Sequence, residues 1–92
     1  MADVFGSIIG QVHDPEGFPL PGATVTARGT GSSERVTVTD AGGRFRFPDT
    51  PPGAYTVIAE LEGFTTSRRQ VTVPIDRTVD MEITLQIAQV VG

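Results

Sequence analysis

The sequence predicts an all-β fold, a seven-stranded antiparallel Greek-key β-sandwich. Short stretches rich in Val, Ile, Thr and Phe alternate apolar with polar residues, as half-buried strands do. The 11 glycines and seven prolines are spread along the chain, so turns separate these stretches, and no stretch has a helical period. Ninety-two residues fit one domain, residues 1–92. Seven short strands favour two packed sheets, and a closed barrel of similar size is the alternative.

The first three strands are expected at Gly6–Val12, Ala23–Arg28 and Arg35–Thr39. A loop rich in proline and glycine, His13–Gly22, joins the first two. The segment Gly29–Glu34 has nothing apolar to bury and is expected to be the most mobile stretch between strands. Ile8, Gly10 and Val12 share one face of the first strand, and the residues expected inward on the next two are Val25, Ala27, Val36 and Val38.

A tight turn is expected at Asp40–Gly43, because the Asp40 side chain can accept backbone N–H bonds and the glycines tolerate positive φ. The turn would join the third strand to Arg44–Phe47 in a hairpin. Phe45 and Phe47 share one face of that strand and are predicted core anchors.

Three more strands are expected at Ala54–Leu61, Thr65–Val73 and Thr78–Ile87. Tyr55 opens the first of them, where its ring can be buried while its hydroxyl reaches a loop carbonyl. The remaining residues expected on the apolar faces are Val57, Ala59, Leu61, Val71, Val73, Val79, Met81, Ile83, Leu85 and Ile87. The apolar pattern continues through Ala88–Gly92, which suggests a chain trimmed from something longer.

Missing residue types exclude much chemistry. The chain has no Cys, Trp or Lys and a single histidine, His13, which removes thiolate nucleophiles, disulfides, Schiff-base lysines and His-His metal pairs. We therefore expect no catalytic residue and no cofactor. A net charge of −4 disfavours nucleic acid as a partner. No apolar run approaches the ~20 residues that span a bilayer, and the first residues lack the features of a signal peptide, which fits a cytosolic chain or an excised domain.

Acidic side chains in the loops are the only candidate metal ligands. Asp14, Glu16, Asp40 and Asp49 would approach one another at one end of a sandwich, and oxygen-rich loops can hold Ca²⁺. No Asp-x-Asp-x-Asp ladder is present, so Asp14 and Asp40 are better explained as turn-forming residues, and no metal site is predicted.

Six residues are candidates for contact with a ligand or partner. Phe18 and Phe64 are the aromatic residues expected at the surface, where they would stack on a sugar, although Phe18 is better explained as a lid on the end of the sandwich. Arg68 and Arg69 form a basic pair that Arg44 and Arg46 would join if their strands were neighbours. Such arginines usually lie on edge strands, where their charge prevents another sheet from pairing with the edge. The alternative is a docking face for an acidic partner or another domain.

Four segments resemble the carboxypeptidase regulatory-like domain: residues 10–25, residues 38–45, Pro52-Gly-Ala-Tyr-Thr-Val57 and Gly63-Phe64. The resemblance covers about residues 6 to 87 and implies a prealbumin-like sandwich, close in architecture to transthyretin, to collagen-binding adhesin repeats and to starch-binding modules. The ending Thr84–Val91 is similar to the stretch that follows such a domain at the front of bacterial TonB-dependent outer-membrane receptors.

The resemblance implies a non-catalytic accessory domain, a spacer or protein-interaction module of an exported or outer-membrane bacterial protein, and hence an extracytoplasmic location. Its expected partner is a protein or a neighbouring domain of the same chain. A carbohydrate-binding module is the alternative. The isopeptide bond of related adhesins needs lysine and asparagine, and the chain has neither. Transthyretin-like hydrolases need several histidines, and a hydrolase here would require a buried polar cluster around His13.

Overall fold

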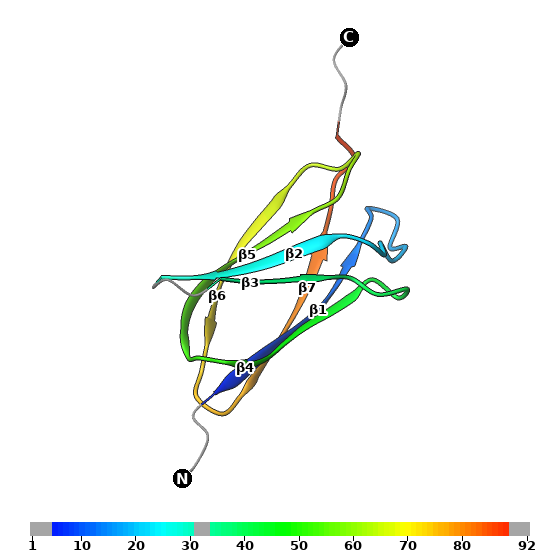
Figure 1. Ribbon diagram of the computed structural model, residues 1–92. Coiled ribbons are helices and arrows are strands. Elements are labelled where there is room, and N and C mark those ends of the chain that lie inside the picture. Colours follow the sequence, from blue (N-terminus) through cyan, green and yellow to red (C-terminus); the bar gives the residue numbers. More distant parts are fainter. Residues whose placement is uncertain (1–4, 31–33, 89–92) are drawn as a thin grey trace.

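A computed structural model describes residues 5–30 and 34–88, which form seven strands in two sheets (Figure 1). The predicted all-β sandwich is confirmed. The strands are β1 Gly6–His13, β2 Thr24–Gly29, β3 Glu34–Val38, β4 Arg44–Thr50, β5 Gly53–Glu60, β6 Ser67–Val73 and β7 Thr78–Thr84. The described residues contain no helix that is long and apolar enough to cross a membrane.

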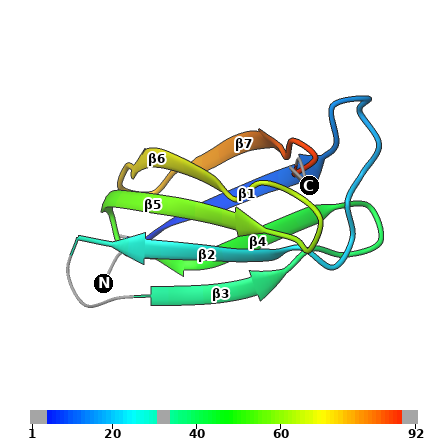
Figure 2. The same cartoon turned by 90° about the horizontal axis from the view of Figure 1, so that it is seen from above.

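The two sheets lie face to face as separate layers (Figure 2). One has the strand order β4-β1-β7 and the other the order β3-β2-β5-β6, and the chain crosses between them after β1, β3, β4 and β6. The neighbouring strands are antiparallel with one exception. β1 and β7 run parallel, from Ser7 opposite Thr78 to His13 opposite Thr84, so the prediction of an antiparallel sandwich differs at this pair. β7 follows β6 of the other sheet and not β1, so no hairpin joins β1 to β7 and makes them antiparallel.

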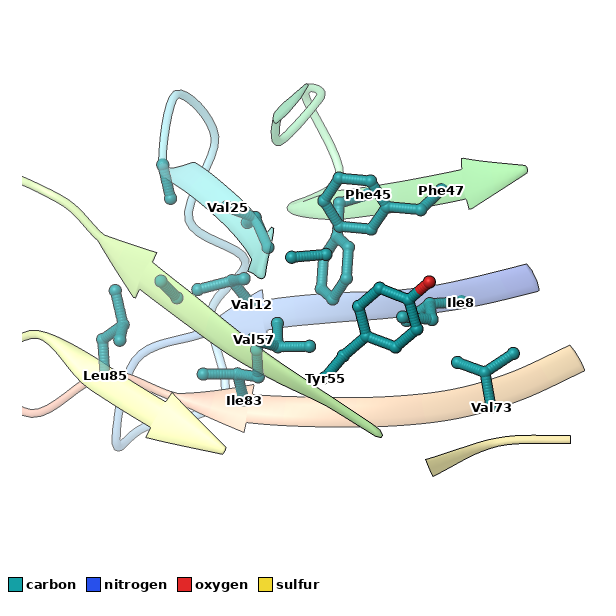
Figure 3. Packing of buried hydrophobic residues seen from close by; sticks show 13 residues of the cluster. Ile8, Val12, Val25, Phe45, Phe47, Tyr55, Val57, Val73, Ile83 and Leu85 are labelled. Carbon is teal, nitrogen blue, oxygen red and sulfur yellow. The ribbon is translucent and has the colours of Figure 1, made fainter. Parts of the chain in front are cut away.

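The core lies between the two layers and draws on six of the seven strands (Figure 3). The phenylalanines of β4 are buried as predicted, and their rings meet edge to face with centroids 5.9 Å apart. Tyr55 is buried, and its hydroxyl donates a hydrogen bond to the carbonyl of Pro51 at 2.6 Å, as predicted. The buried apolar cluster consists of Ile8, Val12, Ala23, Val25, Ala27, Phe45, Phe47, Tyr55, Val57, Ala59, Val73, Ile83 and Leu85.

The third strand is rotated relative to the prediction. Val36 and Val38 are 60% and 56% exposed instead of facing the core. Val36 lies opposite Thr26 and Val38 opposite Thr24, on the outer face of the four-stranded sheet. Alternation in a strand shows which residues share a face but not which face is buried. Two β-branched residues on an edge strand are compatible with the buried face and with the exposed face.

The turn at Asp40–Gly43 forms as predicted, but the hairpin does not. One carboxylate oxygen of Asp40 accepts the backbone N–H groups of Gly42 and Arg44 at 2.9 Å each, and Gly43 has a φ of 72°. The prediction of a hairpin is wrong because β3 and β4 belong to different sheets, so the turn is a corner between the layers.

Two strand ends also differ from the prediction. β4 runs past Phe47 to Thr50, with a bulge where Asp49 adopts a φ of 51°, and an edge strand tolerates Pro48 there. β7 ends at Thr84, and Ile87 is 66% exposed, opposite Phe64 in an isolated bridge. The predicted mobile segment and the apolar ending include residues 31–33 and 89–92, which lie outside the described residues.

Candidate functional site

The six candidate contact residues fall on separate parts of the sandwich. Arg44 and Arg46 lie on β4, an edge of the three-stranded sheet, whereas Arg68 and Arg69 lie on β6, an edge of the four-stranded sheet. The strands of the two arginine pairs are therefore not neighbours, so the condition for a joint patch of four arginines is not met. The chain crosses between the two layers four times. The order of the strands along the sequence therefore does not show which strands are neighbours in space.

The outer face of the three-stranded sheet carries an ordered set of charges. Ile9 of β1 lies between Arg46 of β4 and Asp80 of β7, and in the next row Gln11 lies between Arg44 and Glu82. We call these six residues the three-strand face. Positive charge follows one edge of the face and negative charge the other.

The arginines on this face have no carboxylate partner in the structure as described. No ion pair involves Arg44, Arg46 or Asp80 among residues 5–30 and 34–88. The reason is geometric, since β1 separates the two charged strands, and neighbouring strands are about 4.8 Å apart. The guanidinium groups thus remain available to a carboxylate from outside the domain.

Two adjoining shallow grooves also lie on this side of the molecule. One, of about 440 Å³, is lined by residues of the three-strand face together with Gly10, Asp40 and Phe45. The other, of about 540 Å³, continues toward Phe5 and Arg77 and shares Ile9 and Arg46 with the first. Phe5 is 43% exposed and was not among the aromatics expected at the surface.

The second arginine pair is divided by the alternation of the strand. Arg68 lies opposite Ile58 on the outer face, whereas Arg69 lies opposite Val57 on the inner side. The Arg69 guanidinium donates to the backbone carbonyl of Glu82 in the other sheet at 3.5 Å. Arg69 therefore bridges the two layers along the β6–β7 side.

An arginine that the sequence analysis did not select bridges the opposite side. The Arg35 guanidinium of β3 donates to the carbonyls of Pro48, in a short contact, and of Asp49, at 2.8 Å. Each edge of the three-stranded sheet thus has a backbone carbonyl covered by an arginine from the other layer. Arg35 pairs with Ala27, so its side chain lies on the core side of β2. The sequence does not reveal this pairing, and Arg35 was therefore not selected.

The two candidate aromatics do not form a common platform. Phe18 is 62% exposed in the β1–β2 loop, which does not fit a lid, while Phe64 is half-buried against the core. The loop is held by Asp14, whose carboxylate accepts the backbone N–H groups of Glu16 and Phe18 at 2.9 Å each. Asp14 and Asp40 are thus both turn-forming residues, as expected.

No group of three or more His, Cys, Asp or Glu side chains capable of holding a metal ion occurs in residues 5–30 and 34–88. Glu16 is instead part of the turn that Asp14 organises, and Asp49 occupies the bulge of β4.

The environment of His13 is polar but open. Its Nδ1 lies 3.2 Å from the carbonyl of Asp14 and 3.4 Å from the hydroxyl of Thr84, and its Nε2 lies 3.9 Å from the Glu82 carboxylate. A bond to the Asp14 carbonyl requires a proton on Nδ1, and Nδ1 then cannot accept the proton of Thr84. The Glu82 side chain is 73% exposed. The arrangement therefore orients an imidazole whose side chain is 21% exposed, beside an exposed carboxylate.

Comparisons with known proteins agree with this architecture. The family model described as "Carboxypeptidase regulatory-like domain" matches residues 7–86. A TonB-dependent transporter, Oar, from Myxococcus xanthus is 33% identical over 95 residues, which cover 94% of this chain and 9% of the transporter. The chain thus spans about a tenth of that relative's length.

Solved structures share the fold at low identity. The TIE protein of Bacillus anthracis superposes with a TM-score of 0.80 at 18% identity, over 92% of this chain and 17% of that one. A 3-chlorocatechol 1,2-dioxygenase from Rhodococcus opacus gives a TM-score of 0.74 at 14% identity, over 95% and 62% of the two chains. At such identities the likeness shows the fold alone. With four-fifths and more of its residues matched by one family model, the chain belongs to the carboxypeptidase regulatory-like domain family.

Proposed function

We propose that this domain is a non-catalytic accessory module of an exported or outer-membrane bacterial protein, in which it acts as a spacer and a docking site for protein. Its family membership and its likeness to a small part of a TonB-dependent transporter support this role. By the same likeness, its location is extracytoplasmic. Its partner is another protein or a neighbouring part of the same longer chain.

The spacer role is supported by the way the chain passes through the domain. β1 and β7 are parallel neighbours, so Gly6 at the start of β1 and Thr84 at the end of β7 lie at opposite ends of the sandwich. A strand of eight residues is about 26 Å long, at roughly 3.3 Å per residue. The domain therefore advances the chain by its own length instead of returning it to its point of entry.

The docking role rests on one observation, the grooved three-strand face with its two unpaired arginines. Unpaired Arg44 and Arg46 suit carboxylates of a protein partner, because arginine binds carboxylates through two parallel N–H···O bonds. Ile9, 37% exposed at the centre of the face, provides an apolar contact between the charged rows.

Site-specific photo-crosslinking in the bacterium that makes the protein tests the docking role. A photoreactive residue at Gln11, on the three-strand face, is compared with one at Gln70, on the outer face of β6. We expect Gln11 alone to give a defined crosslink to protein, and the double substitution Arg44→Glu and Arg46→Glu to remove it. Equal crosslinking from both positions, or a crosslink from Gln11 that survives the charge reversal, would contradict the assignment of this face.

A further inference from the structure

The sandwich has four edge strands, β4 and β7 on one sheet and β3 and β6 on the other. An edge strand presents unpaired backbone N–H and C=O groups, with which a strand of another molecule can pair. Proteins usually protect such edges with charges, prolines, bulges or covering groups. Three of these four edges carry such protection.

The protection differs from edge to edge. β4 contains Pro48 and a bulge, and Arg35 covers two of its carbonyls. β7 carries acidic residues on its outer face and has a carbonyl covered by Arg69. β6 begins with Ser67-Arg68-Arg69-Gln70, and its two valines point inward, where Val73 is buried.

The β3 edge lacks this protection because its own charges are engaged elsewhere. Glu34 accepts a hydrogen bond from the Arg28 side chain at 2.8 Å, and Arg35 is directed at the carbonyls of β4. What remains is Val36-Thr37-Val38, an uncharged β-branched segment whose two valines are more than half exposed. Within the described residues β3 pairs with β2 alone.

The backbone of β3 offers hydrogen-bonding groups on alternate residues. Thr39 donates its N–H to the carbonyl of Ala23 on the β2 side, and residues of an antiparallel strand alternate in the direction of these groups. Thr37 and Arg35 therefore bond to β2 as Thr39 does. It follows that Glu34, Val36 and Val38 direct their N–H and C=O groups away from the sheet.

We propose that β3 pairs with β3 of a second copy of this chain, antiparallel and centred on Val36. In this register Val36 lies opposite Val36 of the copy, and Glu34 lies opposite Val38. All three outward-facing residues of each strand are used, which gives about six backbone hydrogen bonds. The two four-stranded sheets become one continuous sheet.

A second copy fits this edge because the segment is complementary to itself. The two-fold arrangement opposes no like charges, since each Glu34 meets a valine and each Arg35 meets Thr37. The pairing also extends an existing row on the outer face, where buried Ile58 lies beside Thr26 and Thr26 beside Val36. The valines of the two copies would cover each other at the end of that row.

The length of the strand limits the strength of the pairing. Five residues span about 17 Å, and such a contact is well below the roughly 1,200 Å² that stable interfaces bury. We therefore expect a weak dimer, monomeric in dilute solution and populated at about 1 mM chain or when two copies are held together.

Charge substitutions at the centre of the pair provide the test. Translational diffusion and amide hydrogen exchange are measured by NMR from low concentration to about 1 mM for the whole chain and for the variants Val36→Lys, Val36→Glu and Gln70→Lys. The last places the same charge on the exposed face of the other edge of this sheet. We expect the unmodified chain and Gln70→Lys to dimerise alike, with slower exchange at Val36 and Val38 at high concentration, and each Val36 variant to remain monomeric.

Mixing the two Val36 variants distinguishes lost pairing from lost folding. Lysine and glutamate would face each other at the centre, so an equimolar mixture should recover the concentration-dependent dimer that neither variant forms alone. Constant diffusion of the unmodified chain up to about 1 mM would overturn the proposal. So would dimerisation that Gln70→Lys abolishes and Val36→Lys does not, or a mixture of Val36 variants that stays monomeric.

Discussion

Replacing Gly10 by alanine tests how closely β1, β4 and β7 pack. A Cβ atom at this position would lie 2.4 Å from Cζ of Phe45 and 2.6 Å from the backbone carbonyl oxygen of Met81. Ordinary van der Waals contacts of a Cβ are 3.4–4 Å long, so both neighbours would have to move away from it. Phe45 is confined by its contact with Phe47, and Met81 is the residue of β7 paired with Gly10.

Overpacking of this kind typically destabilises the fold by about 1–3 kcal/mol. Replacing glycine also lowers the conformational entropy of the unfolded chain, which stabilises the fold by only about 0.4–1 kcal/mol. We expect Gly10→Ala to lower the free energy of unfolding by about 1–2 kcal/mol. Urea denaturation followed by circular dichroism measures the change, because the chain has no tryptophan.

Two further variants sharpen the test of Gly10. Gly42→Ala is the matched control, since its Cβ would meet only a carboxylate oxygen at 3.6 Å, and we expect it to be neutral or slightly stabilising. In a Phe45→Leu background the cost of Gly10→Ala should shrink, because the ring atoms that it meets are gone. A free energy of unfolding for Gly10→Ala equal to that of the unmodified chain would refute this account of the packing.

Four other predictions follow from contacts in the fold and loops. Asp40→Ala removes the acceptor of two backbone N–H groups and should cost about 1–2 kcal/mol in urea denaturation, and an unchanged midpoint would show that the corner holds without it. Tyr55→Phe should cost about 1 kcal/mol by the same assay, since the carbonyl of Pro51 loses its donor, and no loss would mean that water replaces the hydroxyl. In Arg35→Lys the ammonium group cannot donate to both carbonyls of β4, so the free energy of unfolding should fall by about 0.5–1.5 kcal/mol. Equal stability would show that this bridge does not stabilise the fold. Soluble glucans should leave the NMR signals of the exposed Phe18 unchanged, and a saturable shift there would favour the carbohydrate-binding alternative.

The number of strands and most of the core follow from the sequence because alternation is a local property. Phe45 and Phe47 alternate with Arg44 and Arg46, so only one face of that strand suits burial, and Tyr55, Val57 and Ala59 alternate into the core in the same way. The turn at Asp40 was also predictable, since an aspartate followed by glycines forms it without help from the rest of the chain.

The arrangement of the strands depends on distant partners and was not accessible in this way. Val36 and Val38 alternate as well as any core pair, but their register against β2 turns them outward. The same register directs the Arg35 side chain toward the carbonyls of β4. Because β4 and β6 belong to different sheets, the two pairs of arginines lie apart. The three-strand face depends equally on the parallel placement of β7 beside β1, which no local pattern specifies.

That parallel pair also determines how the domain would respond to tension. A force that pulls the chain apart from the start of β1 and the end of β7 acts along both strands in opposite directions. From Ser7–Thr78 to His13–Thr84, every pairing between them would then be loaded in shear and at the same time. Hydrogen bonds loaded together must break together, whereas those of an antiparallel pair pulled from one end open one after another. A small sandwich without disulfides can in this way resist unfolding by force more strongly than its modest core suggests.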